Sequence, residues 1–207
     1  MRHLTLVTLL SLSSVIAHAD EQTRKTPPFK SIDLRGPMSI EVKAGQAHSL
    51  TVRGNEKFLR EVVTEVVGGE LRISMPEKGA TEMKGDPRII VTMPELCKFS
   101  VNGAGESLLK NISCDRFDAS YNGAGRLNVT GKAKQVKLHA RGVGEVDTKA
   151  LIADDVDVNF QGVGSVKVYA KERLDAKVQG IGELTYYGKP KSVHKSASGL
   201  GQVSAGD

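Results

Sequence analysis

The chain has 207 residues and a formal net charge of +5, and aromatic side chains make up only 4% of it. Its basic and acidic residues are interspersed, without a cluster of lysines and arginines, which argues against nucleic acid as a partner. A chain of this length fits a single domain.

The N-terminal segment, residues 1–19, has the three parts of a secretory signal peptide. A short basic start precedes an apolar run at 4–16, and a small-x-small motif ends at Ala19. Cleavage is therefore predicted before Asp20, which leaves 28 basic and 24 acidic residues and a net charge of +4. Because no segment reaches the length of a spanning helix, we expect an exported protein without a transmembrane segment in its mature part.

The mature chain is predicted to begin with a flexible polar lead-in at 20–28. Residues 29–93 follow as irregular N-terminal coils. The first of them, Phe29–Val42, is a degenerate copy of a repeat that becomes regular later, because apolar residues alternate on both sides of a corner at Gly36.

Residues 56–67 combine a helical spacing of apolar side chains with four valines, which predicts a short helical turn followed by a strand. Gly68 and Gly69 favour a tight turn, so 63–67 and 71–75 are expected to form a hairpin. A strand is expected at 49–53, before a turn at Gly54 and Asn55. After the hairpin, a charged loop and a strand are expected at 76–87 and 89–93.

Residues 94–207 form regular repeats, in which Gly-x-Gly tripeptides recur every 18 to 20 residues. A fixed period near twenty is the signature of stacked repeats. We therefore expect an all-β, single-domain parallel β-helix or β-solenoid, with coils of about 19–20 residues that turn at the glycines. The tripeptides begin at Gly103, Gly123, Gly142, Gly162, Gly180 and Gly199 and end at Gly105, Gly125, Gly144, Gly164, Gly182 and Gly201.

Apolar and polar residues alternate before and after each tripeptide, as in strands with one buried face. Core columns are predicted at the positions six, four and two before the first glycine and four after it. The residue between the glycines is always apolar, so we expect the corner to tuck into the core. An antiparallel sandwich of hairpins closed by the same tripeptides is the alternative architecture.

The column immediately before the first glycine carries mostly amides, which can hydrogen-bond along the stack or present donors and acceptors to a sugar chain. Tyr169 and Tyr187 share the position seven after the glycine and are candidates for an aromatic sugar platform. The candidate ligand column consists of Asn102, Asn122, Arg141, Gln161 and Gln179.

The column five before the first glycine carries charges of mostly alternating sign. Between stacked neighbours, opposite charges stabilise a register by roughly 0.2–1 kcal/mol per pair. The exception is Asp157 beside Asp175, with Asp155 nearby, and paired carboxylates can cleave glycosidic bonds. A solvated acidic patch is the simpler interpretation, so no catalytic residue is assigned. The column consists of Lys98, Asp118, Lys137, Asp157, Asp175 and His194.

No cofactor or metal is expected from the sequence. The three mature histidines lack ligand spacing for zinc. The position after the second glycine includes Arg126 and Ser165, which do not suit a calcium ladder. Cys97 and Cys114 are the only cysteines and lie about one coil apart, which favours a disulfide in an exported protein.

The last repeat departs from the core pattern, because Lys195 stands where earlier repeats have an apolar residue. We expect this coil to be weakly capped and to pair with a second molecule as a weak two-fold homodimer.

The segments Phe29–Val42 and Val91–Leu96, together with the sixfold repeat of an apolar residue, any residue, Gly, an apolar residue and Gly, resemble the putative auto-transporter adhesin head family. This family is also called the GIN domain family. The resemblance extends over 29–207 and implies a bacterial exported protein with a β-helical fold, in the periplasm, outside the cell or on its surface. It carries no set of catalytic residues.

The expected function is non-enzymatic binding of a polysaccharide or another cell-surface component at the bacterial envelope. A carbohydrate-active enzyme that uses the acidic cluster is the first alternative. A structural envelope protein without a fixed ligand is the second.

Overall fold

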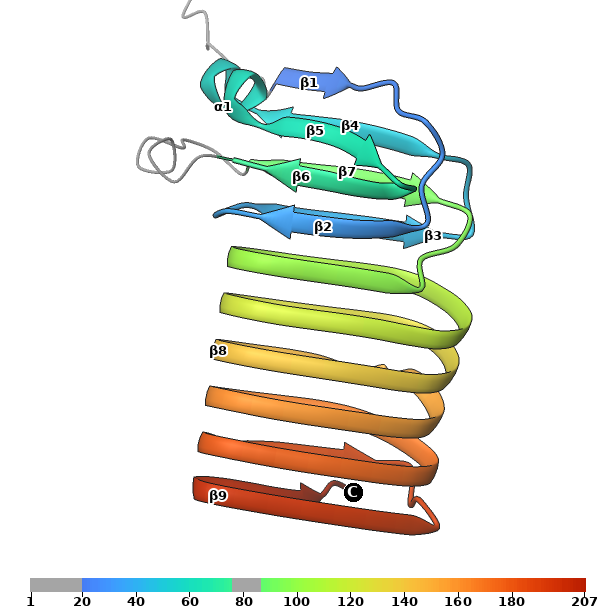
Figure 1. Ribbon diagram of the computed structural model, residues 1–207, viewed down its shortest axis with the longest axis vertical. Coiled ribbons are helices and arrows are strands. Elements are labelled where there is room, and N and C mark those ends of the chain that lie inside the picture. Colours follow the sequence, from blue (N-terminus) through green and yellow to red (C-terminus); the bar gives the residue numbers. More distant parts are fainter. Residues whose placement is uncertain (1–19, 76–86) are drawn as a thin grey trace, which may run out of the picture.

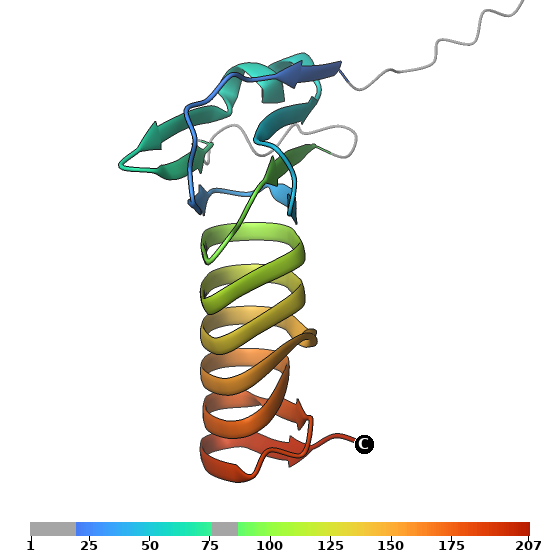
Figure 2. The same cartoon turned by 90° about the vertical axis from the view of Figure 1, so that its right-hand side faces the viewer.

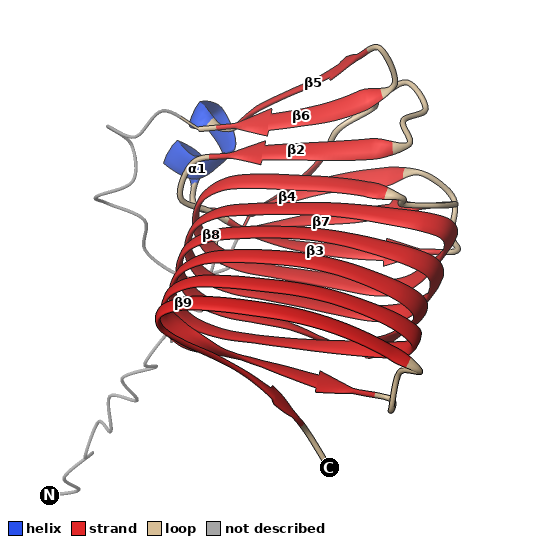
Figure 3. Cartoon of the chain, turned by 60° about the horizontal axis from the view of Figure 1, so that its bottom comes forward, coloured by secondary structure: helices blue, strands red, loops and turns tan. Residues whose placement is uncertain are grey.

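The computed structural model describes residues 20–75 and 87–207, so the predicted signal peptide and most of the charged loop lie outside the described residues. Almost all of the described chain is strand, and the helix in it is too short and polar to span a membrane (Figure 3). The elements are β1 (Asp20–Thr23), β2 (Ser31–Arg35), β3 (Ser39–Ala44), β4 (Ser49–Gly54), α1 (Glu56–Glu61), β5 (Val63–Val67), β6 (Glu70–Ser74), β7 (Arg88–Met93), β8 (Lys98–Tyr187) and β9 (Ser192–Ala205).

The strands form one nine-stranded sheet, in which β8 is a single 90-residue strand. Figure 1 shows β8 winding down the long axis in stacked turns, with β9 beneath the last of them. The pairing of β8 with β9 is parallel and in register, since Leu174 faces Val193 and Leu184 faces Val203. The same columns that the repeat predicts are therefore in contact at this end.

The sheet bends at each Gly-x-Gly, and glycine stacks on glycine from turn to turn. Gly142 has a φ of 121°, in the region that side chains rarely adopt. A Cβ at Gly142 would also collide with the carbonyl oxygen of Gly123 in the turn above. Both the backbone angle and the close approach of two turns therefore require glycine.

Within the described residues, the predicted core columns are buried in every turn before the last, except that Cys97 is half-buried. Two positions before the glycine, Tyr121, Phe160 and Val178 are at most 4% exposed. In the last turn Val193 is 36% exposed, and Lys195 and Ala197 are also exposed. The alternation of apolar and polar residues therefore gives the correct strand phase, and the interior opens only at β9.

The corner residues lie outside, contrary to the expectation that they tuck into the core. Val143, Val163, Ile181 and Leu200 are 56%, 46%, 56% and 78% exposed, and Ala104 and Ala124 are exposed as well. At most corners the positive φ angles of the glycines carry the residue between them around the outside of the bend. The result is a row of apolar side chains along one edge of the stack.

The predictions for 29–75 are confirmed. β2 and β3 pair in parallel with the first turn of β8, on the two sides of Gly36, as the degenerate first copy requires. The helical turn is α1, and β5 and β6 form the antiparallel hairpin around Gly68 and Gly69.

The lead-in prediction is wrong for its first residues, because β1 pairs antiparallel with β4. Arg24 then holds this segment on the domain by donating hydrogen bonds to the carbonyl oxygens of Val62 and Leu59, at 2.6 and 2.7 Å. A guanidinium can satisfy several carbonyls at once, which a polar composition alone does not reveal.

The N-terminal end of the stack is closed by β1 and α1 (Figures 1 and 2). The Asn55 side chain accepts a hydrogen bond from the backbone N–H of Phe58 at 2.8 Å and caps the helix. Phe58 is 1% exposed, so the helix covers this end of the core with an aromatic ring.

Candidate functional site

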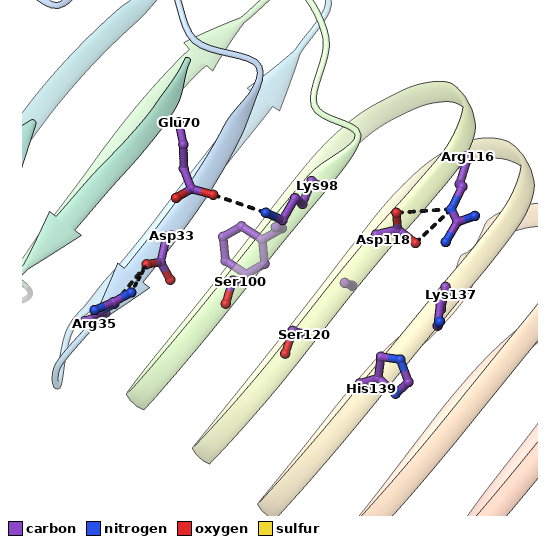
Figure 4. A pocket seen from close by; sticks show the side chains of 12 residues that line it. Asp33, Arg35, Glu70, Lys98, Ser100, Arg116, Asp118, Ser120, Lys137 and His139 are labelled. Carbon is purple, nitrogen blue, oxygen red and sulfur yellow. Dashed lines mark hydrogen bonds and ion pairs between the residues drawn. The ribbon is translucent and has the colours of Figure 1, made fainter. Parts of the chain in front are cut away.

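A polar groove lies on the strands that precede the glycine corners, where β2 meets the first turns of β8 (Figure 4). Its volume is about 490 Å³. We define the polar groove by its polar lining side chains; Phe99 and Ala119 complete the lining, and the polar members are Asp33, Arg35, Glu70, Lys98, Ser100, Arg116, Asp118, Ser120, Lys137 and His139.

The groove exists because the side chains along its middle include two short serines. β2 pairs with the first turn so that Asp33 faces Ser100, and the repeat places Ser120 and His139 in the following turns. Lys98 and Lys137 stand two residues earlier in their turns, and their longer side chains form a wall of the groove. Two serines between longer side chains leave a trough that runs across the strands, along the axis of the stack.

Each acid of the groove is paired with a base. Arg35 pairs with Asp33 at 2.7 Å, Lys98 with Glu70 at 3.2 Å, and the Nε of Arg116 with Asp118 at 3.0 Å. Two of these pairs join residues of the same strand. The column of alternating charges predicts pairs between stacked neighbours instead. In that column, among the described residues, the one neighbouring pair is His194 with Asp175, at 3.4 Å.

Lys137 and His139 remain without a hydrogen bond or ion pair to any described residue (Figure 4). Arg116 engages Asp118 through a short contact within its own strand, so the aspartate does not engage Lys137. A lysine without a counter-ion, in a groove that two serine hydroxyls also line, is a candidate site for an external anion.

The groove continues into a second hollow of about 260 Å³ that shares Ser120 and His139 with it. Its floor includes Asn159, whose Oδ1 atom is buried and has no hydrogen-bond partner. Buried carbonyl oxygens nearly always accept a hydrogen bond. An unpaired carbonyl oxygen in a hollow is therefore a position at which a ligand could donate one. Arg141 forms the rim and donates to the Oε1 of Gln161 at 2.9 Å.

The structure places part of the predicted ligand column here. Asn122, Arg141 and Gln161 line the second hollow, whereas Asn102 lies in a separate hollow near Pro37. Gln179 lines none of these hollows.

The predicted aromatic platform lies elsewhere. Tyr169 and Tyr187 belong to the strands that follow the corners, the opposite arm of each turn from the groove. The Tyr187 ring is covered by the ammonium of Lys149, 3.8 Å from its centroid. A sugar in the groove would therefore not stack on these rings.

Sequence reasoning missed the middle of the groove. Ser100, Ser120 and His139 share the position three before the first glycine, and their small or neutral side chains between a charged column and a column of mostly amides were the available signal. Asn159 and Lys177 continue the same column in later turns.

The three aspartates of the catalytic alternative lie beside one arginine. Arg173 contacts Asp155 at 3.9 Å and forms a closer ion pair with Asp175. Asp155 and Asp157 line a hollow of about 190 Å³ together with Arg173 and Lys137. Two of the three carboxylates thus share one guanidinium.

The thiols of Cys97 and Cys114 lie within hydrogen-bonding reach of each other, and the structure holds both in the reduced form. Burial raises the pKa of both thiols. Within residues 20–75 and 87–207, no cluster of histidine, cysteine and acidic residues is suited to hold a metal ion.

The sequence pattern of one family, described as "Putative auto-transporter adhesin, head GIN domain", matches residues 28–190. No curated protein matches the chain. The crystal structure of a putative adhesin from Bacteroides fragilis has a TM-score of 0.71 at 24% identity and covers 92% of this chain and 98% of that chain. A putative adhesin from Parabacteroides merdae has a TM-score of 0.50 at 12% identity, with coverage of 92% and 97%. These structures share the fold, and the chain belongs to the family of auto-transporter adhesin head GIN domains.

Proposed function

We propose that this protein is an exported, non-enzymatic β-solenoid that binds an acidic polysaccharide at the bacterial envelope through the polar groove. The observation that carries the proposal is Lys137, a cation without an acidic partner among the described residues, beside Ser120 and His139. A carboxylate or sulfate of a sugar chain would supply the missing anion, and the serine hydroxyls would hydrogen-bond its neighbouring oxygens.

The direction of the groove favours a polymer over a small molecule. It crosses the strands and continues from Asp33 to Gln161 through the two connected hollows. An extended chain lying along it would meet Lys137 and then the orphan oxygen of Asn159. A sugar hydroxyl can donate a hydrogen bond to that oxygen, which a fully ionised anion such as sulfate cannot.

Exported bacterial adhesion fits this site, because surface polysaccharides are extended and many carry acidic groups. The family and the similar crystal structures are named as adhesins, which supports a binding role. The enzyme alternative finds less support, because a glycosidase needs two carboxylates that flank the scissile bond. Here Arg173 contacts both Asp155 and Asp175.

The proposal is tested by binding of polygalacturonate, which is carboxylated, with neutral dextran as the reference polymer. We expect salt-sensitive binding of polygalacturonate and none of dextran. Lys137→Gln should weaken binding about tenfold or more, since a hydrogen bond to a charged group contributes about 1.5–3 kcal/mol. Lys132→Gln removes the same charge from an exposed position outside the groove and should leave the affinity unchanged.

Equal losses in the Lys137 and Lys132 variants would mean that binding follows net charge and not the groove. Absence of binding to any carboxylated or sulfated polymer would contradict the proposal as a whole. Release of new reducing ends from polygalacturonate, abolished by Asp157→Asn, would replace it with the enzyme alternative.

A further inference from the structure

The row of corner residues forms an apolar ridge, which we define as Ala104, Ala124, Val143, Val163, Ile181 and Leu200. Its members lie in consecutive turns at the spacing of stacked strands, about 4.8 Å. All six are exposed, and from Val143 onward the exposed fractions run from 46% to 78%. Contiguous exposed apolar rows of this kind are typical of interaction surfaces.

A groove lies beside the first half of the ridge, along the second glycine of three successive corners. It has a volume of about 500 Å³, its floor is Gly105, Gly125 and Gly144, and its outer wall is Glu106, Arg126 and Glu145. The floor has no side chains because a Cβ at these glycines would collide with the turn above. The edge of the stack therefore carries a ridge and a groove of the same repeat, side by side.

We propose that a second copy of this chain docks here, with the ridge of each copy packed against the ridge of the other. The ridges run in the same direction, and a two-fold axis lies between them, parallel to the stack. A second copy shares the spacing of this ridge turn for turn, whereas the residues of an extended peptide, about 3.3 Å apart, do not.

The charges beside the ridge support this arrangement. Under the two-fold axis, the residue after the second glycine of one copy faces the residue before the first glycine in the same turn of the other. Glu145 then faces Arg141 of the second copy, which is an opposite pair. Glu106, Arg126 and Glu183 each face an amide, and no turn brings like charges together.

This surface differs from the C-terminal coil, through which the sequence predicts pairing. In β9 the Lys195 ammonium donates to the carbonyl oxygen of Val203 at 3.4 Å and so reaches across the open end of the core. The ridge has six residues per copy, fewer than the roughly 20–30 residues per partner of a standard interface, so we expect a weak dimer that forms at micromolar concentrations.

Sedimentation equilibrium up to several hundred micromolar tests the proposal. The unmodified protein should dimerise, and Val163→Lys should raise the dissociation constant at least tenfold. Val63→Lys is the matched control, because Val63 is 53% exposed on β5, outside the ridge, and should leave the constant unchanged. Lys195→Leu should also leave it unchanged, whereas tighter dimerisation in that variant would overturn the ridge in favour of the C-terminal coil.

Single cysteines in a Cys97→Ser, Cys114→Ser background test the direction. In the same-direction dimer, Ala104→Cys and Ile181→Cys should each form a disulfide between the two copies under mild oxidation. Neither of these end positions meets itself in an antiparallel ridge dimer, so their failure to crosslink would overturn the arrangement. A strict monomer at every concentration would overturn the proposal itself.

Discussion

At the scale of single residues, the corner glycines are the positions where the fold tolerates the least change. Gly142→Ala should destabilise the protein by about 3 kcal/mol or more, because the added Cβ collides with a backbone carbonyl and the φ of 121° is strained for alanine. The expected observation is a lower midpoint in urea unfolding followed by circular dichroism.

Gly45→Ala is the matched control for the corner. Gly45 also has a positive φ, 83°, but a Cβ there meets no atom within 4 Å. Its variant should lose only the cost of the backbone angle, about 1–2 kcal/mol. Equal losses of stability in the two variants would mean that the collision between turns adds nothing to the cost of a side chain at the corner.

The two cysteines give a second prediction at this scale. The thiols are adjacent, so oxidation in the exported environment should join Cys97 to Cys114 with little movement. Because burial raises the pKa of both thiols, their thiolates are scarce near neutral pH, and unassisted oxidation should be slow and accelerate as the pH rises.

Intact-mass measurement checks this pairing. We expect protein from an oxidising compartment to be two daltons lighter than its reduced form, without a free thiol after unfolding. Rapid labelling of two thiols in the unreduced, unfolded protein would refute the disulfide.

At the scale of the strand, alternation decides which side chain enters the core. Val158 is 1% exposed within its turn of β8, whereas Asp157 beside it points outward into a hollow. Val158→Asp should therefore cost several kcal/mol, because it buries a charge without a partner. Asp157→Asn should change stability by less than about 0.5 kcal/mol, and thermal unfolding of the two variants separates them.

The strands and their phase could be predicted because they depend on local patterns that recur along the chain. The hairpin around Gly68 and Gly69 and the buried columns around Val158 are of this kind. The orientation of the corner residues could not be predicted. An apolar residue between two glycines can point into the core or outward, and only the backbone angles decide which.

The polar groove was predictable only in part, since it depends on contacts between distant segments. Arg141 and Gln161 belong to a column that the repeat makes visible. Lys137, in contrast, lacks a counter-ion although Asp118 stands in the turn before it, because that carboxylate is engaged by Arg116 of its own strand, and sequence gives no rule for that choice. β1 was missed because its partner, β4, is a short strand 30 residues away.

At the scale of the whole molecule, ion pairs between turns make stability depend on pH. A hydrogen bond from Lys110 lowers the pKa of Glu41, and one from Lys167 lowers the pKa of Glu145. Because both folded-state values lie below the ordinary 4.5, the two carboxylates stabilise the fold above that pH. This contribution is lost as the pH falls through the lowered values.

We therefore expect the free energy of unfolding to be nearly constant from pH 6 to 7 and to fall below about pH 4.5. Urea titrations at a series of pH values measure the decrease in the free energy of unfolding at low pH, which we call the acid limb. This decrease should be less steep in the double variant Glu41→Gln, Glu145→Gln. Glu65→Gln, an exposed carboxylate of β5, serves as the control and should leave the limb unchanged. An acid limb of identical slope in the double variant would show that other groups govern it.

The stacking of β8 also determines how the molecule responds to mechanical force. β1 and β9 lie at opposite ends of the long axis, so tension between them acts along the hydrogen bonds that join one turn to the next. These hydrogen bonds should break one turn after another and not all at once. Each released turn lengthens the chain by about 65–70 Å at an extension of 3.3–3.6 Å per residue. Under tension between its two ends, the protein would therefore lengthen in steps and resist with a limited force.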